Sequence, residues 1–177
     1  MGNLATLILR LVLGGLMAGH GAQKLFGSFG GPGLEGTSGF MEMLGLKPGK
    51  TWAWLAALSE FGGGVLTVLG LLNPLGPIGV IGSMSMATIT AHGGKPIWVT
   101  EGGAELPITN IAAATALMLN GPGKFSLDTA FGIRLPRVLA PLGLVVVVLA
   151  VLYGGTGGET ELGQDEAREG TAGNGEE

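Results

Sequence analysis

Five apolar stretches, separated by segments rich in glycine and proline, dominate the chain. The first four run from Leu4 to about Gly21, from Thr51 to Leu72, from Leu75 to His92 and from Leu106 to Asn120. Each has roughly 15 to 22 residues, about the length that a helix needs to cross the hydrocarbon core of a bilayer. Backbone polar groups in lipid must find their partners within the spanning segment. We therefore predict an all-α integral membrane protein with a four-helix transmembrane bundle.

The composition agrees with a bilayer as the solvent of this chain. Mean hydropathy is +0.51 and only 12% of the residues are charged, which is unusual for a soluble domain. The 36 glycines fit membrane helices, whose backbones approach closely where side chains are small. Cysteine is absent, which excludes disulfides and thiolate metal sites. No basic surface suited to nucleic acid is expected.

The fifth apolar segment, from about Leu135 to Tyr153, differs from the first four. It contains a nearly unbroken run of Val and Leu, whereas the others are interspersed with Gly, Ala, Ser and Thr. We therefore predict an additional hydrophobic helix at the periphery of the bundle. Seven of the 13 acidic residues follow it, against one base, and no apolar face exists there to bury. The predicted division is a bundle (1–130), an additional helix (131–153) and an acidic disordered tail (154–177).

The connections predict which segments share a membrane side. The first loop, the loop from His92 to Pro107 and, if the fifth helix spans, the tail lie on one side, here called the mouth side. A short amphipathic helix is expected in the first loop, from Ser38 to Leu46. The N-terminus, the Asn73 turn and residues 121–136 lie on the other side, here called the N-terminal side. Lys and Arg divide four to three between the two sides, so the positive-inside rule does not decide the orientation.

Few ionisable residues fall within the predicted spans, and each is costly in lipid, at roughly 2.5 to 3.5 kcal/mol on insertion scales. They are Arg10, His20, Glu60 and His92. A rise of 1.5 Å per residue places Glu60 roughly 6 to 8 Å below the level of the two histidines and Arg10 lower still. Each of these residues is therefore a functional candidate.

Helical spacing predicts which faces pack. Glu60 shares a stripe with the small or short side chains of Ala53, Ala57, Gly64 and Thr67, the face expected to meet other helices. In the first span, one face carries Arg10, Gly14 and Gly21, while Gly15 and Gly19 form a GxxxG pattern nearby. In the third span, one face carries Ser85, Thr88 and His92.

Two interpretations of Glu60 stay open at this point. It forms either a structural ion pair with Arg10 or a ligand or proton site with His20 and His92. The histidines end their spans, where they can also simply cap carbonyl groups. Glu105 begins the fourth span, where the helix dipole stabilises a carboxylate. Because the spacing of these residues matches no regular metal motif, no metal site is predicted.

Four segments together resemble the DoxX family of membrane proteins. They are the run from Arg10 to Leu46, SEFGGGVLTVLGLLNP from Ser59, AHGGKPIWVTEGGAELPI from Ala91, and NGPGKFSLD from Asn120. The resemblance covers roughly residues 4–130 and implies a multi-pass protein of the cell membrane with a cytoplasmic N-terminus. The recurring charged positions of the family match Arg10, His20, Lys24, Glu60, His92 and Glu105. The resemblance thus implies that these residues bind a ligand or relay protons. The fifth segment and the tail depart from the four-helix pattern, which leaves the side of the C-terminus open.

The family name derives from similarity to a small subunit of an archaeal thiosulfate:quinone oxidoreductase. The first hypothesis is therefore a membrane component of redox metabolism that binds a quinone-like molecule, the only cofactor suggested, in a mouth-side cavity. The alternative is an accessory protein that anchors a soluble oxidoreductase or stress-response enzyme. A transporter is a weaker third hypothesis because the sequence shows no inverted repeat. None of these patterns identifies a substrate or decides whether a reaction is catalysed.

Overall fold

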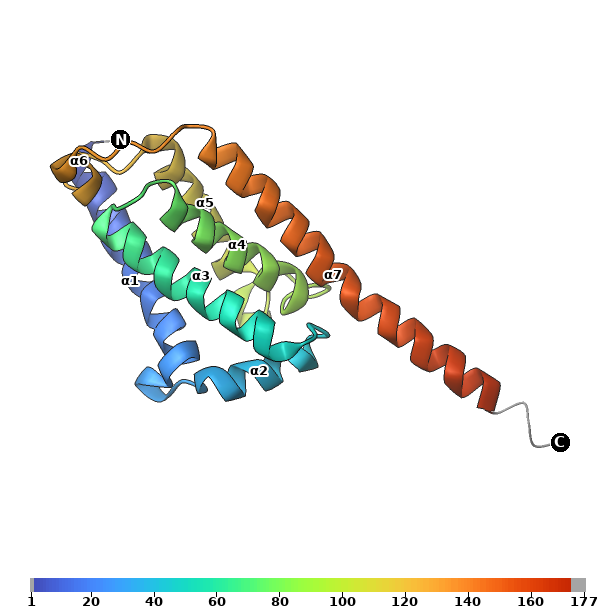
Figure 1. Cartoon of the computed structure of the whole chain (residues 1–177). Coiled ribbons are helices and arrows are strands. Elements are labelled where there is room, and N and C mark those ends of the chain that lie inside the picture. Colours follow the sequence, from blue (N-terminus) through green and yellow to red (C-terminus); the bar gives the residue numbers. More distant parts are fainter. Residues whose placement is uncertain (1, 173–177) are drawn as a thin grey trace.

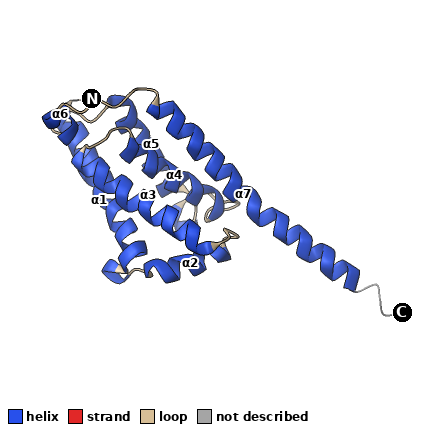
Figure 2. Cartoon of the chain, viewed as in Figure 1, coloured by secondary structure: helices blue, strands red, loops and turns tan. Residues whose placement is uncertain are grey.

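A computed structural model describes the backbone of residues 2–172 and the side chains of residues 2–155. The regular structure in this part of the chain is helical (Figure 2). Its α-helices are α1 (Asn3–Phe26), α2 (Gly33–Met43), α3 (Gly49–Leu69), α4 (Leu75–Thr90), α5 (Glu105–Asn120), α6 (Leu127–Phe131) and α7 (Leu139–Ala172). Two short 3-10 helices, η1 (Ser28–Gly30) and η2 (Val99–Glu101), lie in the loops.

Glycines in the left-handed conformation end the two longest helices of the bundle. Helix α1 stops at Gly27, with φ 67°, and α3 stops at Gly70, with φ 59°. Glycine adopts this conformation without steric cost, so it is the usual residue at such ends. Helix α1 continues more than a turn beyond the predicted end at Gly21, and α2 begins five residues before the predicted start at Ser38. The extension of α1 brings Lys24 into a helix that packs along α3.

The helices α1, α3, α4 and α5 lie side by side, and α7 runs along α4 at the edge (Figure 1). Helix α2 lies across one end of the bundle, while the N-terminus and α6 lie at the other (Figure 1). At the N-terminal side, Asn3 Oδ1 accepts a hydrogen bond of 3.0 Å from the Lys124 amide. On the mouth side, the Trp52 and Tyr153 rings stack with centroids 6.2 Å apart. The two ends of the bundle thus carry the segments that the sequence assigns to each side.

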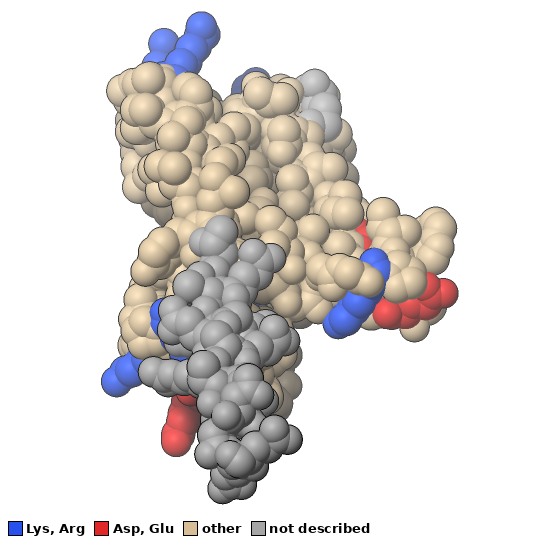
Figure 3. Space-filling view, turned by 90° about the vertical axis from the view of Figure 1, so that its right-hand side faces the viewer, with Lys and Arg blue, Asp and Glu red and all other residues tan. Residues whose placement is uncertain are grey.

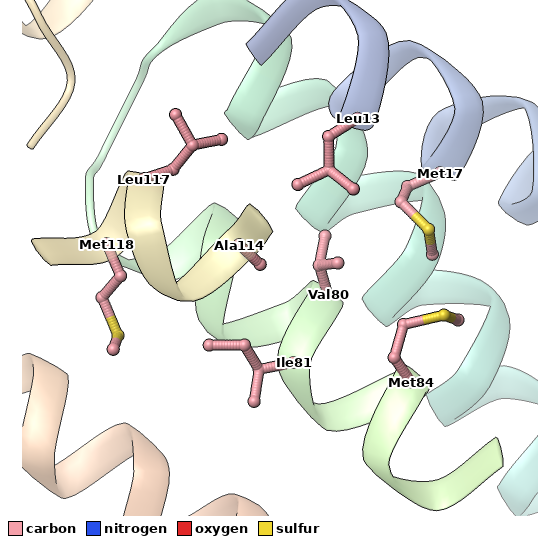
Figure 4. Packing of buried hydrophobic residues seen from close by; sticks show 8 residues of the cluster. All are labelled: Leu13, Met17, Val80, Ile81, Met84, Ala114, Leu117 and Met118. Carbon is pink, nitrogen blue, oxygen red and sulfur yellow. The ribbon is translucent and has the colours of Figure 1, made fainter. Parts of the chain in front are cut away.

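One hydrophobic core fills the space between α1, α4 and α5. Figure 4 shows its side chains on the three helices, with Leu13 and Met17 turned toward Val80 and Met84. Its members are Leu13, Met17, Val80, Ile81, Met84, Ala114, Leu117 and Met118. A second cluster, of Met41, Leu46, Trp52 and Ala53, joins α2 and the turn that follows it to the start of α3. Helix α4 therefore turns one face to this core, which leaves its other face for α3 and α7.

Helices α1 and α3 touch through their backbones at two levels. A Cβ atom built on Gly14 would lie 2.7 Å from the Gly64 carbonyl oxygen, and one on Gly21 would lie 2.2 Å from the Phe61 nitrogen. Gly14 and Gly21 are buried together with Arg10, as the predicted face requires. The predicted GxxxG contact of residues 15 and 19 is wrong, because a Cβ on either glycine would meet nothing within 4 Å. The packing surface is rotated from that pair toward Gly14.

The predicted stripe of α3 is confirmed in full, because all five of its residues are buried, Glu60 to 2% exposure. On the predicted face of the third span, Ser85 and Thr88 of α4 are only half-buried. His92 lies beyond the helix, because α4 ends at Thr90. The buried face of α4 instead carries Val80, Ser83 and Met84 among others. This face is rotated because α4 packs against three helices, α3, α5 and α7.

Two helices, Asn3–Phe26 and Gly49–Leu69, are long and apolar enough to cross a membrane, and two shorter apolar helices are Leu75–Thr90 and Leu139–Gly155. Many large apolar side chains of α1, α3 and α7 face outward. On the face drawn in Figure 3, charged atoms lie toward the two ends and leave an uncharged band between them. Helix α7 continues to Ala172, past the predicted end of the fifth hydrophobic segment. Residues 173–177 lie outside the described residues, and disorder of the acidic tail stays a prediction.

Candidate functional site

A cavity of about 430 Å³ lies between α3, α4 and α7, and residues of α2 and of the turn after it line its mouth-side end. Its walls are almost wholly apolar, and they include Trp52, Met86 and Val147. Polar groups come from Lys24, Ser59, Glu60, Ser83 and Thr90. Two of these groups are already engaged, because the Ser83 and Thr90 hydroxyls donate to carbonyl oxygens of their own helix. The cavity therefore has long apolar walls and one charged corner.

Small residues on three helices leave this space empty. Helix α4 contributes Gly79, Gly82 and Ala87, and α3 contributes Ala56. Helix α7 packs closely on α4 at Gly143, which has no side chain. A Cβ built on Gly143 would lie 2.6 Å from the Ile78 Cδ1 atom. The helices are thus held together at their contact points while the short side chains between those points cannot fill the volume.

The charged corner consists of an ion pair between Lys24 and Glu60. The ammonium group of Lys24, in the last turn of α1, donates to Glu60 Oε1 on α3. The Glu60 side chain is 3% exposed and that of Lys24 is 27% exposed. Glu60 Oε2 is buried without a hydrogen-bond partner. Burial of a carboxylate is costly unless a counter-charge compensates it, and Lys24 provides that counter-charge for Glu60. Glu60 Oε2 can still accept a hydrogen bond beside the cavity.

Arg10 belongs to a different cluster, at the N-terminal side, and does not pair with Glu60. Its Nε donates to the Thr67 carbonyl at 2.9 Å and its Nη2 to the Val68 carbonyl at 2.6 Å. Its Nη1 donates to the carbonyls of Pro122, at 2.9 Å, and Phe125, at 2.6 Å. Seven residues of α3 separate Glu60 from Thr67, which is roughly 10 Å along the helix. The proposed Arg10–Glu60 ion pair is therefore wrong, because orphan carbonyls at the end of α3 take the guanidinium donors.

Asp128 is the buried acid that the sequence reading did not single out. It is 3% exposed, and its two carboxylate oxygens accept from the amides of Leu72 and Asn73, each at 2.8 Å. These bonds join α6 to the turn between α3 and α4. A possible signal in the sequence is the pattern S-x-x-T, since Ser126 caps α6 by accepting from the Thr129 amide. Arg10 and Asp128 together thus anchor the loops of this side.

The other predicted site residues lie outside the cavity. His20 is exposed on α1. His92 Nδ1 lies 2.6 Å from the Gly102 carbonyl oxygen, and Glu105 Oε2 accepts from the Val99 amide at 3.0 Å. These two contacts hold the loop between α4 and α5. Of the six predicted residues, the structure brings Lys24 and Glu60 into contact at the cavity, whereas His92 and Glu105 each contact a different backbone group of the loop between α4 and α5.

The arrangement offers little to a metal ion. Among the described residues, no three His, Cys, Asp or Glu side chains gather in a group that could hold one. A Lys–Glu pair in an apolar wall can instead exchange hydrogen bonds with the polar end of an organic ligand. Sequence reasoning missed the walls of this cavity, because Gly82, Ala87 and Val147 carry no chemical signal of their own.

Residues 5–93 match the family model described as DoxX, and the match covers half of the chain. The chain belongs to the DoxX family. The predicted resemblance is thereby confirmed, and because DoxX is a membrane family, the chain is a membrane protein. The matched region includes α1 to α4 and therefore the Lys24–Glu60 pair, whereas Glu105 and α7 lie beyond it. Searches of curated proteins and of solved structures found no match to this chain.

Proposed function

We propose that this DoxX-family protein binds a quinone-like molecule in the cavity and serves as a membrane component of redox metabolism. One observation carries the proposal: the apolar cavity ends in a buried ion pair whose Glu60 Oε2 atom has no partner. Ligand sites in proteins typically combine apolar walls with a few convergent polar groups in roughly 300 to 1,000 Å³. A head group with an isoprenoid chain has the same division into a polar end and a long apolar part.

The residues fit both redox states of such a head group. The Lys24 ammonium carries three donors, of which Glu60 takes one, so it can donate to a quinone carbonyl. The Glu60 carboxylate accepts only and can take a hydrogen bond from a quinol hydroxyl. A bound quinone would supply two-electron redox chemistry. Lys24 and Glu60 would orient the head group and hold a proton beside it, while the walls of α4 and α7 exclude water.

The proposed topology is multi-pass in the cell membrane. We place the N-terminus in the cytoplasm, as the family resemblance implies, and the cavity mouth on the opposite side. Outward apolar side chains on α1, α3 and α7 support the insertion of these helices into the membrane. Trp98 and Tyr153, which are 59% and 73% exposed, lie at the mouth side, as expected of aromatic residues at the membrane interface.

The test is to purify the full-length protein in a mild detergent and extract bound lipids for quinone analysis. Ala87 lines the cavity, so Ala87→Phe should fill it and reduce the retained quinone by roughly tenfold or more, since a ring needs much of the available volume. Glu60→Gln, which keeps the shape but removes the charge, should reduce retention less. Ala112→Phe on α5 is the matched control, because Ala112 is exposed and lies outside the cavity.

Two results would contradict the proposal. One is the absence of quinone from the wild-type protein, even after addition of a short-chain quinone analogue. The other is equal retention by the Ala87→Phe and Ala112→Phe variants, which would place any bound quinone outside the cavity.

A second candidate function is that of an accessory protein that anchors a soluble oxidoreductase or stress-response enzyme. The observation that favours it is the exposure of large apolar side chains on η1 and α2, where Phe29 is 83% exposed and Met43 is 79% exposed. Cross-linking in cells through a photoreactive residue at position 43 distinguishes the two functions. Capture of one soluble enzyme would support the anchor, whereas cross-links to lipid alone would assign these side chains to the membrane interface.

A further inference from the structure

The charges of the described side chains are distributed unevenly between the two sides of the bundle. Of the six acidic side chains among residues 2–155, five lie in α2, in α3 or in the segment from η2 to the start of α5, namely Glu35, Glu42, Glu60, Glu101 and Glu105. The sixth, Asp128, is the only one on the N-terminal side, and its oxygens are occupied by the amides of residues 72 and 73. At the upper end of the face in Figure 3, blue atoms accordingly appear without red ones.

Three exposed cations project from this N-terminal side: Lys124, Arg134 and Arg137. Neither guanidinium has a hydrogen-bond or ion-pair partner among the described residues. Arg10 cannot share their role, because its donors are committed to the carbonyls of residues 67, 68, 122 and 125. Within the part of the chain whose side chains are described, the guanidinium donors of both arginines are thus free.

The two arginines line a hollow of about 380 Å³ between α6, the segment that leads to α7 and the Asn73 turn. Thr129 and Asn73 also line it and add polar side chains. In the same part of the chain, Phe125 is 55% exposed and Phe131 is 71% exposed. The site therefore combines a cationic, polar pocket with large apolar side chains, and it lies where α1 begins and α3 ends.

We propose that this hollow binds the phosphate head group of an anionic membrane lipid. Guanidinium groups form paired hydrogen bonds with phosphate oxygens, and basic pockets at the ends of membrane helices are suited to anionic lipid head groups. Phe125 and Phe131 would contact the acyl chains just below the head group. The acceptors of the phosphate match the donors of Arg134 and Arg137. Asp128 also lines the hollow, but its two oxygens accept from the amides of residues 72 and 73, and among the described residues it forms no ion pair with either arginine. This site is distinct from the cavity, and it stands whether or not the cavity binds a quinone.

The test uses the full-length, delipidated protein in detergent and native mass spectrometry. The probes are dioleoyl-phosphatidylglycerol and dioleoyl-phosphatidylcholine, which share acyl chains and differ in head-group charge. One basic residue near an anionic surface contributes about fivefold in affinity, so the wild type should prefer the anionic lipid by roughly 25-fold. Arg134→Gln/Arg137→Gln should abolish most of this preference. The matched control is Lys47→Gln/Lys50→Gln, which removes two exposed cations with the same spacing on the mouth side.

Unchanged preference in the arginine double variant would overturn the proposal, as would an equal loss in the lysine control. If inorganic phosphate alone raised the melting temperature of the protein as much as phosphatidylglycerol does, the hollow would be a site for a free anion. This result would also overturn the proposal. The melting temperature of the double variant in neutral detergent confirms that the variant folds. If it does not fold, the single variants Arg134→Gln and Arg137→Gln provide the comparison, each with an expected loss of about fivefold.

Discussion

The guanidinium group of Arg10 lies against Gly70, so that a Cβ atom built on this glycine would be 2.4 Å from Arg10 Cζ. Gly70 is also the left-handed residue that ends α3, with φ 59°. One glycine therefore serves both the turn and the burial of the arginine. The donors of Arg10 reach the carbonyls at the end of α3 only because no side chain stands at residue 70.

Replacing Gly70 by alanine should destabilise the protein by about 3 kcal/mol. An L residue in the left-handed region costs about 1 to 2 kcal/mol, and displacement of Arg10 would leave buried carbonyls unpaired, at about 1 to 3 kcal/mol each. Thermal unfolding in detergent measures the effect. The control is Gly15→Ala, where a Cβ meets open space and where alanine favours the helix. A Gly70→Ala protein as stable as the wild type would show that Arg10 is not held as described.

Lys24 and Glu60 should show a coupling energy in a double-mutant cycle. Lys24→Met leaves a buried carboxylate without its counter-charge, and because Lys24 is partly exposed we expect a loss of about 2 kcal/mol rather than the larger value of a fully buried pair. Adding Glu60→Gln should restore most of this loss. The unfolding free energies of the four proteins in detergent give the coupling. Additive effects of the two changes would contradict the ion pair.

Arg10 and Glu60 should, in contrast, behave independently. Their clusters lie roughly 10 Å apart along α3 and share no partner, so the effects of Arg10→Met and Glu60→Gln should add to within about 0.5 kcal/mol. Arg10→Lys should rescue little, since one ammonium group cannot reproduce a fork that serves four carbonyls. Recovery of stability in the Arg10→Met/Glu60→Gln protein would revive the direct ion pair between these residues.

The close contact of α1 with α3 predicts a strong effect of a small change at Gly21. Gly21→Ala would place a Cβ 2.2 Å from a backbone nitrogen of Phe61, and the helices would have to move apart at a typical cost of about 1 to 3 kcal/mol. Gly19→Ala, two residues away on the same helix, meets nothing within 4 Å and should be neutral or stabilising. Melting temperature and the monodisperse yield in detergent report the difference. Equal yields would mean that the helices are not packed this closely.

The absence of native cysteine allows the sidedness of the chain to be tested with single cysteines. Gly31 belongs to the segment that carries α2, and Thr129 lies in α6, at opposite sides of the bundle (Figure 1). Cysteines at positions 31 and 129 should therefore react with an impermeant thiol reagent from opposite faces of the membrane. A cysteine at position 161 in the tail should react from the same face as position 31, since Tyr153 already contacts Trp52 on the mouth side. Labelling of positions 31 and 161 from opposite faces would place α7 on the membrane surface.

Much of the helical framework follows from local sequence. Glycines at residues 27, 70 and 121 end α1, α3 and α5, and the prolines at residues 48 and 74 precede α3 and α4. The burial of Glu60 also followed from its spacing, because residues three and four apart share a helix face. The family, too, could be identified from sequence, because four segments between Arg10 and Asp128 resemble it.

Only the tertiary structure decided which charges meet. Arg10 found its partners at residues 57 to 115 positions away, and these partners are backbone carbonyls, which every residue carries and which no residue type marks. Lys24 reached Glu60 because α1 continues past Gly21 and packs closely along α3. The cavity likewise forms where short side chains of α3, α4 and α7 face one another. The residue periodicity of a single helix does not show which side chains of the other two helices it will face.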